Sequence, residues 1–344
     1  MDGESLTDVM RELLLRAGLD ASDVTVQPLA GGGNNRVFVV KSGNCSYLAK
    51  VYFSHPSDDR DRLGAEWDLL SLAWDAGLRC VPRPVASDRH HHLGLYEFVE
   101  GRKVGDAEVT QDFTEQALTF FVRLNDRRIR QHAGGLRNAS EACFAIEDHL
   151  DLLDRRLQRL SAAAAISEID QEAEAFVHKL RAAWRLVRSD LMRRCDAGAL
   201  TTVLPSEDRC VSPSDFGFHN ALLRPSGELC FIDFEYAGWD DPAKAVGDFF
   251  CQPAIPVPLR YFDAFVSHAF GYSSNPESLE LRARLLLPVF QFKWCCIMLN
   301  EFLPDAAQRR RFADPGMDPE RRKRNQLDKA HRYFQSTVGE SWPT

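Results

Sequence analysis

Apolar and polar positions in the first hundred residues alternate between helical and strand-like spacing. Apolar residues recur at every third or fourth position between 5 and 17, and Gly18 follows, which predicts an amphipathic helix there. Short runs rich in β-branched and aromatic residues come next at 24–29, 36–40 and 46–52, separated by turn-like segments with glycine and asparagine. These runs predict an antiparallel sheet near the N-terminus.

The pattern then becomes mostly helical. A helix is expected over about residues 60–76, and two more strands follow before residue 100. Beyond them, apolar residues at helical spacing mark helices around 146–160 and 169–191. We therefore expect a small sheet-rich lobe over 1–100 and a larger helical lobe over 101–344, and a cleft between two such lobes is a natural site for a small molecule.

Composition narrows the classes of function. The 344 residues carry a formal net charge of −8, which argues against nucleic acid as the main partner. The N-terminus has acidic residues where a secretory signal would have Lys or Arg, and no apolar run approaches the roughly 18 residues that span a bilayer. The sequence therefore predicts a cytoplasmic protein without a membrane partner and leaves the oligomeric state open. The nine cysteines include no Cys-x-x-Cys pair, so we predict that they are reduced thiols. The run from Arg89 to His92 is predicted to form the tip between two strands.

One lysine lies inside an apolar strand. Lys50 in "LAKVY" is costly to bury without a partner, and Glu66 on the following helix is a candidate to orient it. If Lys50 faces the cleft, it can hold phosphate oxygens as a point charge; the alternative is a solvated lysine on an edge strand. The three glycines from Gly31 to Gly33 can bring backbone N–H groups close to a phosphate, or can simply form a flexible turn.

A polar pair stands in the otherwise aromatic and apolar stretch "SPSDFGFHNALL". Asp215 and Asn220 are five residues apart there, just before a short apolar run, and Asp233 follows the next strand in "CFIDFEYAG". A hairpin with Asn220 before one strand and Asp233 after the next can bring both to one end of the ribbon. A carboxylate and a carboxamide oxygen suit Mg²⁺, with Asp215 placed beside them as a base. Each acid taken separately can instead be a turn residue that caps its own backbone.

These segments resemble the kinase-like phosphotransferases that include aminoglycoside phosphotransferases and choline or ethanolamine kinases. That family carries His-x-Asp-x-x-x-x-Asn followed by a strand ending in Ile-Asp-Trp/Phe-Glu, and the corresponding pieces here are "PSDFGFHN" and "IDFE". The resemblance spans about residues 24–253. It implies an α+β, bilobal, protein-kinase-like fold, with a small antiparallel-sheet N-lobe and a larger, mostly helical C-lobe.

The same resemblance implies a role for each residue. Asp215 would accept or orient the proton of a substrate hydroxyl, while Asn220 and Asp233 would hold Mg²⁺ on the phosphates of ATP or GTP. The segment "YEFVEG" resembles the hinge whose backbone binds the base. The nucleotide-binding residues implied in this way are Gly31, Gly32, Gly33, Asn34, Asn35, Lys50, Glu66, Glu97 and Val99.

Two positions depart from the family's pattern. The loop histidine is replaced by Pro213, and the acid expected four residues after Asp241 is replaced by Ala245, with Asp248 three residues further on. Proline stiffens the chain but cannot repeat the hydrogen bonds of an imidazole. Both changes affect the support of the catalytic loop rather than its reacting groups.

The acceptor is a small molecule with a hydroxyl group, and its identity stays open. An amino alcohol, amino sugar or aminoglycoside is favoured, with walls expected from Trp239, Asp240, Trp294 and Glu301. The alternatives are a neutral sugar or nucleoside, or a catalytically silent nucleotide-binding scaffold. A protein kinase is disfavoured because no long activation segment follows Asp233. The C-terminal tail from about Phe312, with "RRRF" before it and "PERRKRNQ" within it, is locally basic, and a solvated helix end is favoured there over an anion site.

Overall fold

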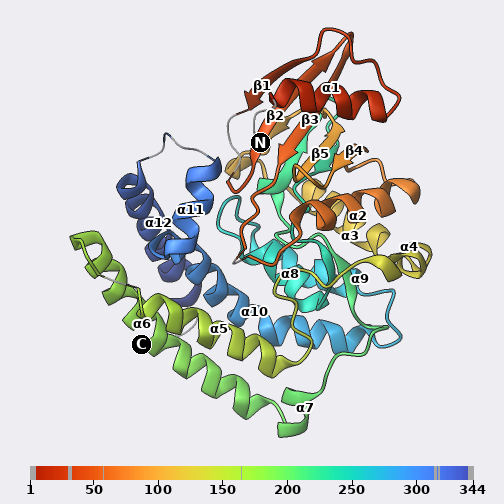
Figure 1. Cartoon of the computed structure of the whole chain (residues 1–344). Helices are drawn as coiled ribbons and strands as arrows, with labels where there is room; N and C mark the ends of the chain where they lie inside the picture. The colour runs from red at the N-terminus through yellow and green to blue at the C-terminus, as the bar shows by residue number, and fades with distance from the viewer. Residues whose placement is uncertain are drawn as a thin grey trace.

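The computed structural model of the chain describes residues 5–29, 33–56, 58–163, 165–313, 316 and 318–339. Figure 1 shows a sheet with helix α1 at the top and a larger group of helices below it. The sheet has five antiparallel strands, and the rest of the described chain is mainly helical. The expected α+β class, with a small antiparallel sheet before a larger helical part, is therefore confirmed.

The sheet has the strand order β1-β2-β3-β5-β4. Helix α1 packs on it through Met10, Leu13 and Leu14, which share a core with strand residues such as Val40 and Leu95. The side chain of Ser5 accepts the N–H of Asp8 and so begins the helix. The elements of this part are α1 (Leu6–Arg16), β1 (Thr25–Leu29), β2 (Arg36–Ser42), β3 (Cys45–Val51), α2 (Arg62–Asp75), β4 (Pro84–Asp88) and β5 (Leu93–Glu97).

The helical part is built around α8, a ten-residue helix whose residues are all buried, and α10, which packs along it (Figure 1). Buried leucines of α5 and aromatic residues of α6 and α10 extend the same core. The helices are α3 (Gln111–Leu124), α4 (Arg127–His132), α5 (Ile146–Ser161), α6 (Glu168–Arg194), α7 (Ala197–Thr201), α8 (Pro242–Cys251), α9 (Phe262–Ala269), α10 (Pro276–Met298), α11 (Pro304–Ala313) and α12 (Pro319–Tyr333). Short turns of other helix types are η1 (Asp106–Glu108), η2 (Ala133–Gly135), η3 (Phe218–Asn220), η4 (Leu259–Tyr261), η5 (Leu299–Phe302) and η6 (Phe334–Gly339).

Two small sheets support the segment that the sequence singled out. Strands β8 and β9 form a hairpin in which Ala221 pairs with Phe231, and β6 joins it on the other side of β8. A separate pair, β7 and β10, flanks the loop before η3. The strands are β6 (Arg102–Lys103), β7 (Cys210–Ser212), β8 (Ala221–Leu223), β9 (Leu229–Phe231) and β10 (Gly238–Asp240).

The boundary expected near residue 100 stays a prediction. The larger core includes Leu69 and Leu70 of α2 and Tyr96 of β5 together with residues of α3. Apolar packing is therefore continuous across the junction between the sheet and the helices.

Helix α10 corrects one expectation from the sequence. Together with η5 it forms a 27-residue segment that is long and apolar enough to cross a bilayer by length and composition, although 61% of its most apolar stretch is buried in the protein. The expectation that no apolar stretch approaches this length was wrong, because the few polar residues within α10 concealed it. Burial against α8 and α5 is what a core helix requires.

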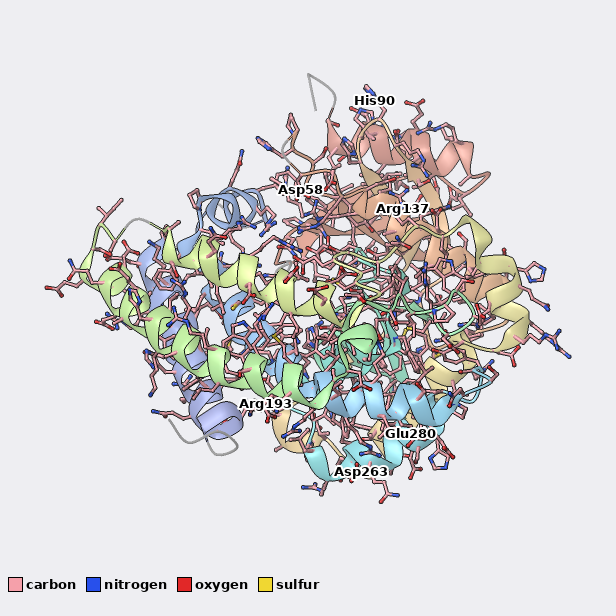
Figure 2. All side chains as sticks on the ribbon, turned by 90° about the horizontal axis from the view of Figure 1, so that it is seen from below. Asp58, His90, Arg137, Arg193, Asp263 and Glu280 are labelled. Atoms are coloured by element: carbon pink, nitrogen blue, oxygen red, sulfur yellow. The ribbon has the colours of Figure 1, made fainter. Side chains whose placement is uncertain are left out.

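Charged and polar side chains lie on several exposed elements of the molecule. In Figure 2, Arg193 of α6 and Asp263 of α9 lie at the surface of the helical part, and His90 lies in the turn between β4 and β5. Among the described residues, no group of three or more His, Cys, Asp or Glu side chains is arranged to hold a metal ion. The nine cysteines are free thiols, six of them buried.

Candidate active site

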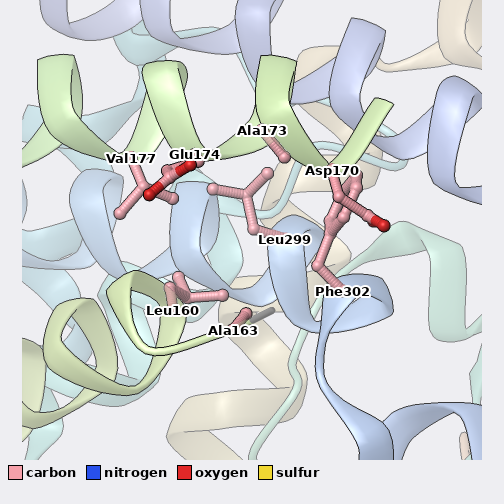
Figure 3. A pocket seen from close by; sticks show the side chains of 8 residues that line it. All are labelled: Leu160, Ala163, Asp170, Ala173, Glu174, Val177, Leu299 and Phe302. Carbon is pink, nitrogen blue, oxygen red and sulfur yellow. The ribbon is translucent and has the colours of Figure 1, made fainter. Parts of the chain in front are cut away.

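A cleft of about 740 Å³ lies between the sheet and the helical part and contains most of the polar residues that the sequence singled out. Its lining includes Asn34 from the sheet side and Asp215, Asn220 and Asp233 from the helical side. A hollow between α5, α6 and η5 (Figure 3) measures only about 10 Å³, which is no more than one water molecule needs. The cleft is therefore the candidate site for chemistry.

Lys50 of β3 joins two carboxylates at the edge of this cleft. Its Nζ lies 2.7 Å from Oε1 of Glu66 and 2.8 Å from Oδ1 of Asp233. The hydroxyl of Tyr52 donates to Glu66 at 2.7 Å and contacts the hydroxyl of Tyr96 at 2.7 Å. The lysine is thus not a solvated edge residue, and its expected pairing with Glu66 is present.

Burial and charge shift the acidity of these groups in opposite directions. Burial raises the pKa of Glu66 even though Lys50 opposes the shift. For Asp233, burial would also raise the pKa, but the charge and hydrogen bond of Lys50 outweigh it and hold the pKa below its usual value. Asp233 is therefore ionised at neutral pH, as a metal ligand must be.

The loop before β8 presents Asp215 to the cleft. His219 Nε2 lies 3.2 Å from Oδ1 of Asp215, while Asn220 Nδ2 donates to the backbone oxygen of Asp215 at 3.0 Å and to its Oδ2 at 3.3 Å. The N–H of Ile232 donates to the backbone oxygen of Asn220 at 2.9 Å. The hairpin therefore brings Asn220 and Asp233 to the same end of the β8–β9 ribbon, as the spacing predicted.

Unusual backbone conformations gather at this cleft. Six described residues other than glycine have positive φ, and four of them, Glu141, Ser214, Asp215 and Asp233, line the cleft. Such conformations cost about 1–3 kcal/mol each and persist where the surroundings hold them. Their concentration here is the kind of strain that functional sites retain.

Lys244 contacts the loop that carries Asp215, next to the two positions that depart from the family's pattern. It is buried on α8, donates to Ser214 Oγ at 3.1 Å, and pairs with Asp240 and with Asp248 at 3.5 Å. Ser214 stands next to Pro213, the replaced histidine, and Lys244 stands next to Ala245, the replaced acid. A lysine–serine contact thus connects α8 to the loop in this chain.

The turn after β1 is tied to the segment that follows Asp233. Asn34 Nδ2 donates to Glu235 Oε1 at 2.9 Å, and Asn35 Nδ2 donates to Glu235 Oε2 at 2.8 Å. Burial and the charge of Asp233 raise the pKa of Glu235 to about 7. Gly33 lines the cleft; the predicted Gly31 and Gly32 lie outside the described residues.

The predicted hinge residues lie elsewhere. Glu97 ends β5, and with Val99 it lines a separate pocket of about 470 Å³ beside Trp74 and Arg224. Neither residue is among those that line the large cleft. Their role in binding the base stays a prediction.

The donor set fits a magnesium ion. Asp233 supplies a carboxylate, Asn220 a carboxamide oxygen, and both line one cleft. Lys50 carries one positive charge between the carboxylates of Glu66 and Asp233. When both acids are ionised, the cluster therefore has a net negative charge, which attracts a divalent cation. Mg²⁺ needs only one or two protein ligands when phosphates and waters complete its shell.

Two expected wall residues are not in the cleft. Trp239 donates its Nε1–H to Ala133 O at 3.0 Å, and Asp240 is fully buried beside Lys244, so the expectation for both was wrong. Trp294 and Glu301 do line the cleft. Both residues lie in β10, where Trp239 pairs with Val211 and Asp240 with Cys210 of β7, and their sequence neighbours did not reveal this pairing.

Several cleft residues were missed by sequence reasoning. Lys244 and Lys293 are buried lysines in apolar helices, the same signal that identified Lys50. The expectation of a solvated helix end was also wrong for part of "RRRF", since Arg309 and Arg310 are half-buried and line the cleft. The remaining cleft residues that were not predicted include Lys103, Glu141, Arg156, Arg159 and His219.

Solved structures with a similar fold include kinases and phosphotransferases of small molecules. Choline kinase LicA from Streptococcus pneumoniae aligns with a TM-score of 0.55 and 17% identity over 96% of this chain and 98% of its own. Plasmodium vivax ethanolamine kinase aligns at 0.52 and 15% over 96% and 95%. A spectinomycin phosphotransferase in complex with ADP and spectinomycin aligns at 0.55 and 13% over 95% and 98%. At these identities the likeness establishes the fold.

Sequence comparison establishes the family. No curated protein matches the chain as a relative. The model of the phosphotransferase enzyme family, however, matches residues 25–265, which include the sheet, the catalytic loop, the β8–β9 hairpin and α8. The chain therefore belongs to the phosphotransferase enzyme family, whose members are small-molecule kinases.

Proposed function

We propose that this protein is an ATP- and Mg²⁺-dependent phosphotransferase that phosphorylates a hydroxyl group of a small molecule. The observation that carries the proposal is the convergence of Asp215, Asn220 and Asp233 on one cleft, with Lys50 held between Glu66 and Asp233 at its edge. Phosphoryl transfer depends mainly on positioning and on charges placed against phosphate oxygens. These residues supply both.

The proposed roles follow from the contacts. Asp215, oriented by His219 and Asn220, aligns the acceptor hydroxyl and takes its proton. Lys50 holds phosphate oxygens, and Glu66 keeps its ammonium in place. Asn220 and Asp233 would hold Mg²⁺, which when bound neutralises charge on the phosphates.

The choice of nucleotide rests on the family and on two similar structures. The spectinomycin phosphotransferase binds ADP, and LicA was solved with AMP. Both support an adenine nucleotide for this chain, with GTP as the alternative. The turn that includes Gly33 and Asn34 would cover the phosphates, and Glu97 and Val99 would meet the base.

The acceptor and the location of the protein remain predictions. The similar choline and ethanolamine kinases support an amino alcohol, and the spectinomycin phosphotransferase an aminoglycoside. A neutral sugar or nucleoside is the alternative acceptor, and a silent nucleotide-binding scaffold is the alternative function. We keep the cytoplasm as the proposed location.

The proposal is tested by measuring ATP and GTP consumption with Mg²⁺ against a panel of aminoglycosides, amino alcohols and sugars. Asp215→Asn, which keeps the size of the side chain, is the blank. Acceptor-dependent turnover that is lost in the variant supports the proposal. Tight nucleotide binding without turnover for any acceptor would favour the scaffold instead.

A further inference from the structure

Lys103 carries a positive charge on β6, the short strand that follows the predicted hinge. It lines the cleft and pairs with Leu222 of β8, two residues after Asn220. Its Nζ donates to the backbone oxygen of His219 at 2.9 Å. The ammonium group is therefore beside the catalytic loop and next to a proposed metal ligand.

The charge of Lys103 also acts on Asp233. Burial would raise the pKa of Asp233, but Lys50 opposes that shift, and the charge of Lys103 adds to the opposition. Burial lowers the pKa of Lys103, while the charge of Asp233 favours its protonated form and that of Lys50 disfavours it. Two lysines thus act on Asp233 from different strands, β3 and β6.

The ammonium group of Lys103 has no carboxylate partner in the described part of the chain. Its one hydrogen bond there goes to the neutral backbone oxygen of His219. Lys244 and Lys293, two buried lysines that line the same cleft, each form an ion pair with an aspartate. An ammonium group has three donors and no acceptor, so two donors of Lys103 remain for a ligand in the cleft.

The position of this charge suits phosphate oxygens. If Asn220 and Asp233 hold Mg²⁺ on the nucleotide, the phosphates lie beside these two residues, and Lys103 is near both. Hydrogen bonds from an ammonium to a phosphate are charge-assisted and about twice as strong as bonds between neutral groups. A neutral hydroxyl would gain only a hydrogen bond, so removing the charge while a donor is kept distinguishes the two ligands.

We propose that Lys103 is a second phosphate-binding cation of this site, which contacts the phosphate oxygens of the nucleotide from β6 while Lys50 contacts them from β3. This inference rests on the proposed kinase function and adds a binding residue to it. Lys50 is already paired with Glu66 and Asp233, whereas Lys103 has no ion pair to give up when a nucleotide binds.

Three variants separate the charge of Lys103 from its shape. Lys103→Gln removes the charge and keeps a hydrogen-bond donor, and Lys103→Arg keeps the charge. Arg102→Gln is the matched control, because Arg102 is the neighbouring cation, pairs with Glu108 and does not line the cleft. Both positions of β6 are exposed, so all three variants should fold.

Calorimetry with Mg²⁺ and the β,γ-imido analogue of ATP measures the contact directly. We expect Lys103→Gln to raise the Kd about tenfold or more, while Lys103→Arg and Arg102→Gln stay close to wild type. An unchanged Kd in Lys103→Gln would overturn the inference. An equal loss in Arg102→Gln, which indicates a general loss of positive potential, or in Lys103→Arg, which indicates a change of shape, would overturn it as well.

Initial rates show which substrate Lys103 contacts. With an acceptor that supports turnover, Lys103→Gln should raise the KM of ATP and leave the KM of the acceptor unchanged. A rise confined to the KM of the acceptor would place Lys103 at the acceptor and refute the assignment.

Binding and turnover separate this inference from the kinase proposal. If the wild type binds the analogue but phosphorylates no acceptor, a higher Kd in Lys103→Gln supports the inference even though the catalytic proposal has failed. Normal turnover with an unchanged Kd in Lys103→Gln overturns the inference and leaves the kinase function standing. A wild-type protein that does not bind the analogue overturns both.

Discussion

Replacing Lys244 by methionine is the sharpest test of how this chain supports its catalytic loop. The side chain is buried, and it contacts Ser214 Oγ, Asp240 and Asp248. Methionine fills a similar volume but leaves two buried carboxylates with less charge compensation. It also removes the contact that reaches the loop residue preceding Asp215.

The expected loss of stability can be worked from these contacts. Removing one partner of a buried ion pair costs about 3–5 kcal/mol. Among the described residues, Lys244 is the cation that forms an ion pair with Asp240, so the variant leaves Asp240 without one. Asp248 keeps its ion pair with Lys293 at 3.0 Å. We therefore expect a fall of about 4 kcal/mol in the free energy of unfolding at neutral pH. Because burial raises the pKa of Asp240, the loss should shrink at acid pH, where that carboxyl can bind a proton.

Urea unfolding of wild type and Lys244→Met at two pH values measures this effect. The double variant Lys244→Met with Asp240→Asn removes the stranded charge and should recover part of the loss. Steady-state kinetics should show a lower kcat with little change in the KM of ATP, since Ser214 loses an anchor and the nucleotide contacts are untouched. A single variant within about 1 kcal/mol of wild type would refute the argument that Lys244 compensates buried charge.

Three further predictions concern the site. Asp215→Asn should lower kcat by about 10²–10⁴-fold while calorimetry finds nucleotide binding unchanged; near-normal turnover would remove Asp215 from its role. Glu66→Gln should weaken the hold on Lys50 and lower kcat/KM for ATP, as measured by initial rates, and an unchanged value would argue against the pairing at 2.7 Å. Glu235 has a pKa raised to about 7 from its usual 4.5, so it binds a proton more tightly in the folded chain. Its contribution to stability is present below about pH 4.5 and is lost as pH rises through about 7, by up to about 3 kcal/mol. Unfolding at pH 5 and 7.5 should show that Glu235→Gln reduces this fall, and an identical pH dependence in both proteins would contradict the assignment.

The acceptor side is where sequence-based prediction was weakest. Trp239 and Asp240 were expected to line the acceptor site. Both instead lie in β10 and pair with β7, and the indole of Trp239 donates to Ala133 O. Arg156 and Lys293 were not predicted, because they come from helices about 140 residues apart in sequence, and only packing of α5 beside α10 brings them to one surface. Side-chain direction on a buried helix depends on all the helices around it, which periodicity cannot specify.

The sequence by itself determined the order of the main elements and predicted that Asn220 and Asp233 lie at one end of a hairpin. Local spacing was enough for the hairpin that joins Asn220 to Asp233, since two short strands separated by a few turn residues favour antiparallel pairing. The position of Lys50 within an apolar strand also predicted that its ammonium group has a charged partner. Tertiary structure alone decided that Lys50 also contacts Asp233, that Lys244 connects α8 to Ser214, and which charged side chains line the helical side of the cleft. Those contacts join residues far apart in the chain, and their energies depend on burial and distance that exist only once the lobes have packed together.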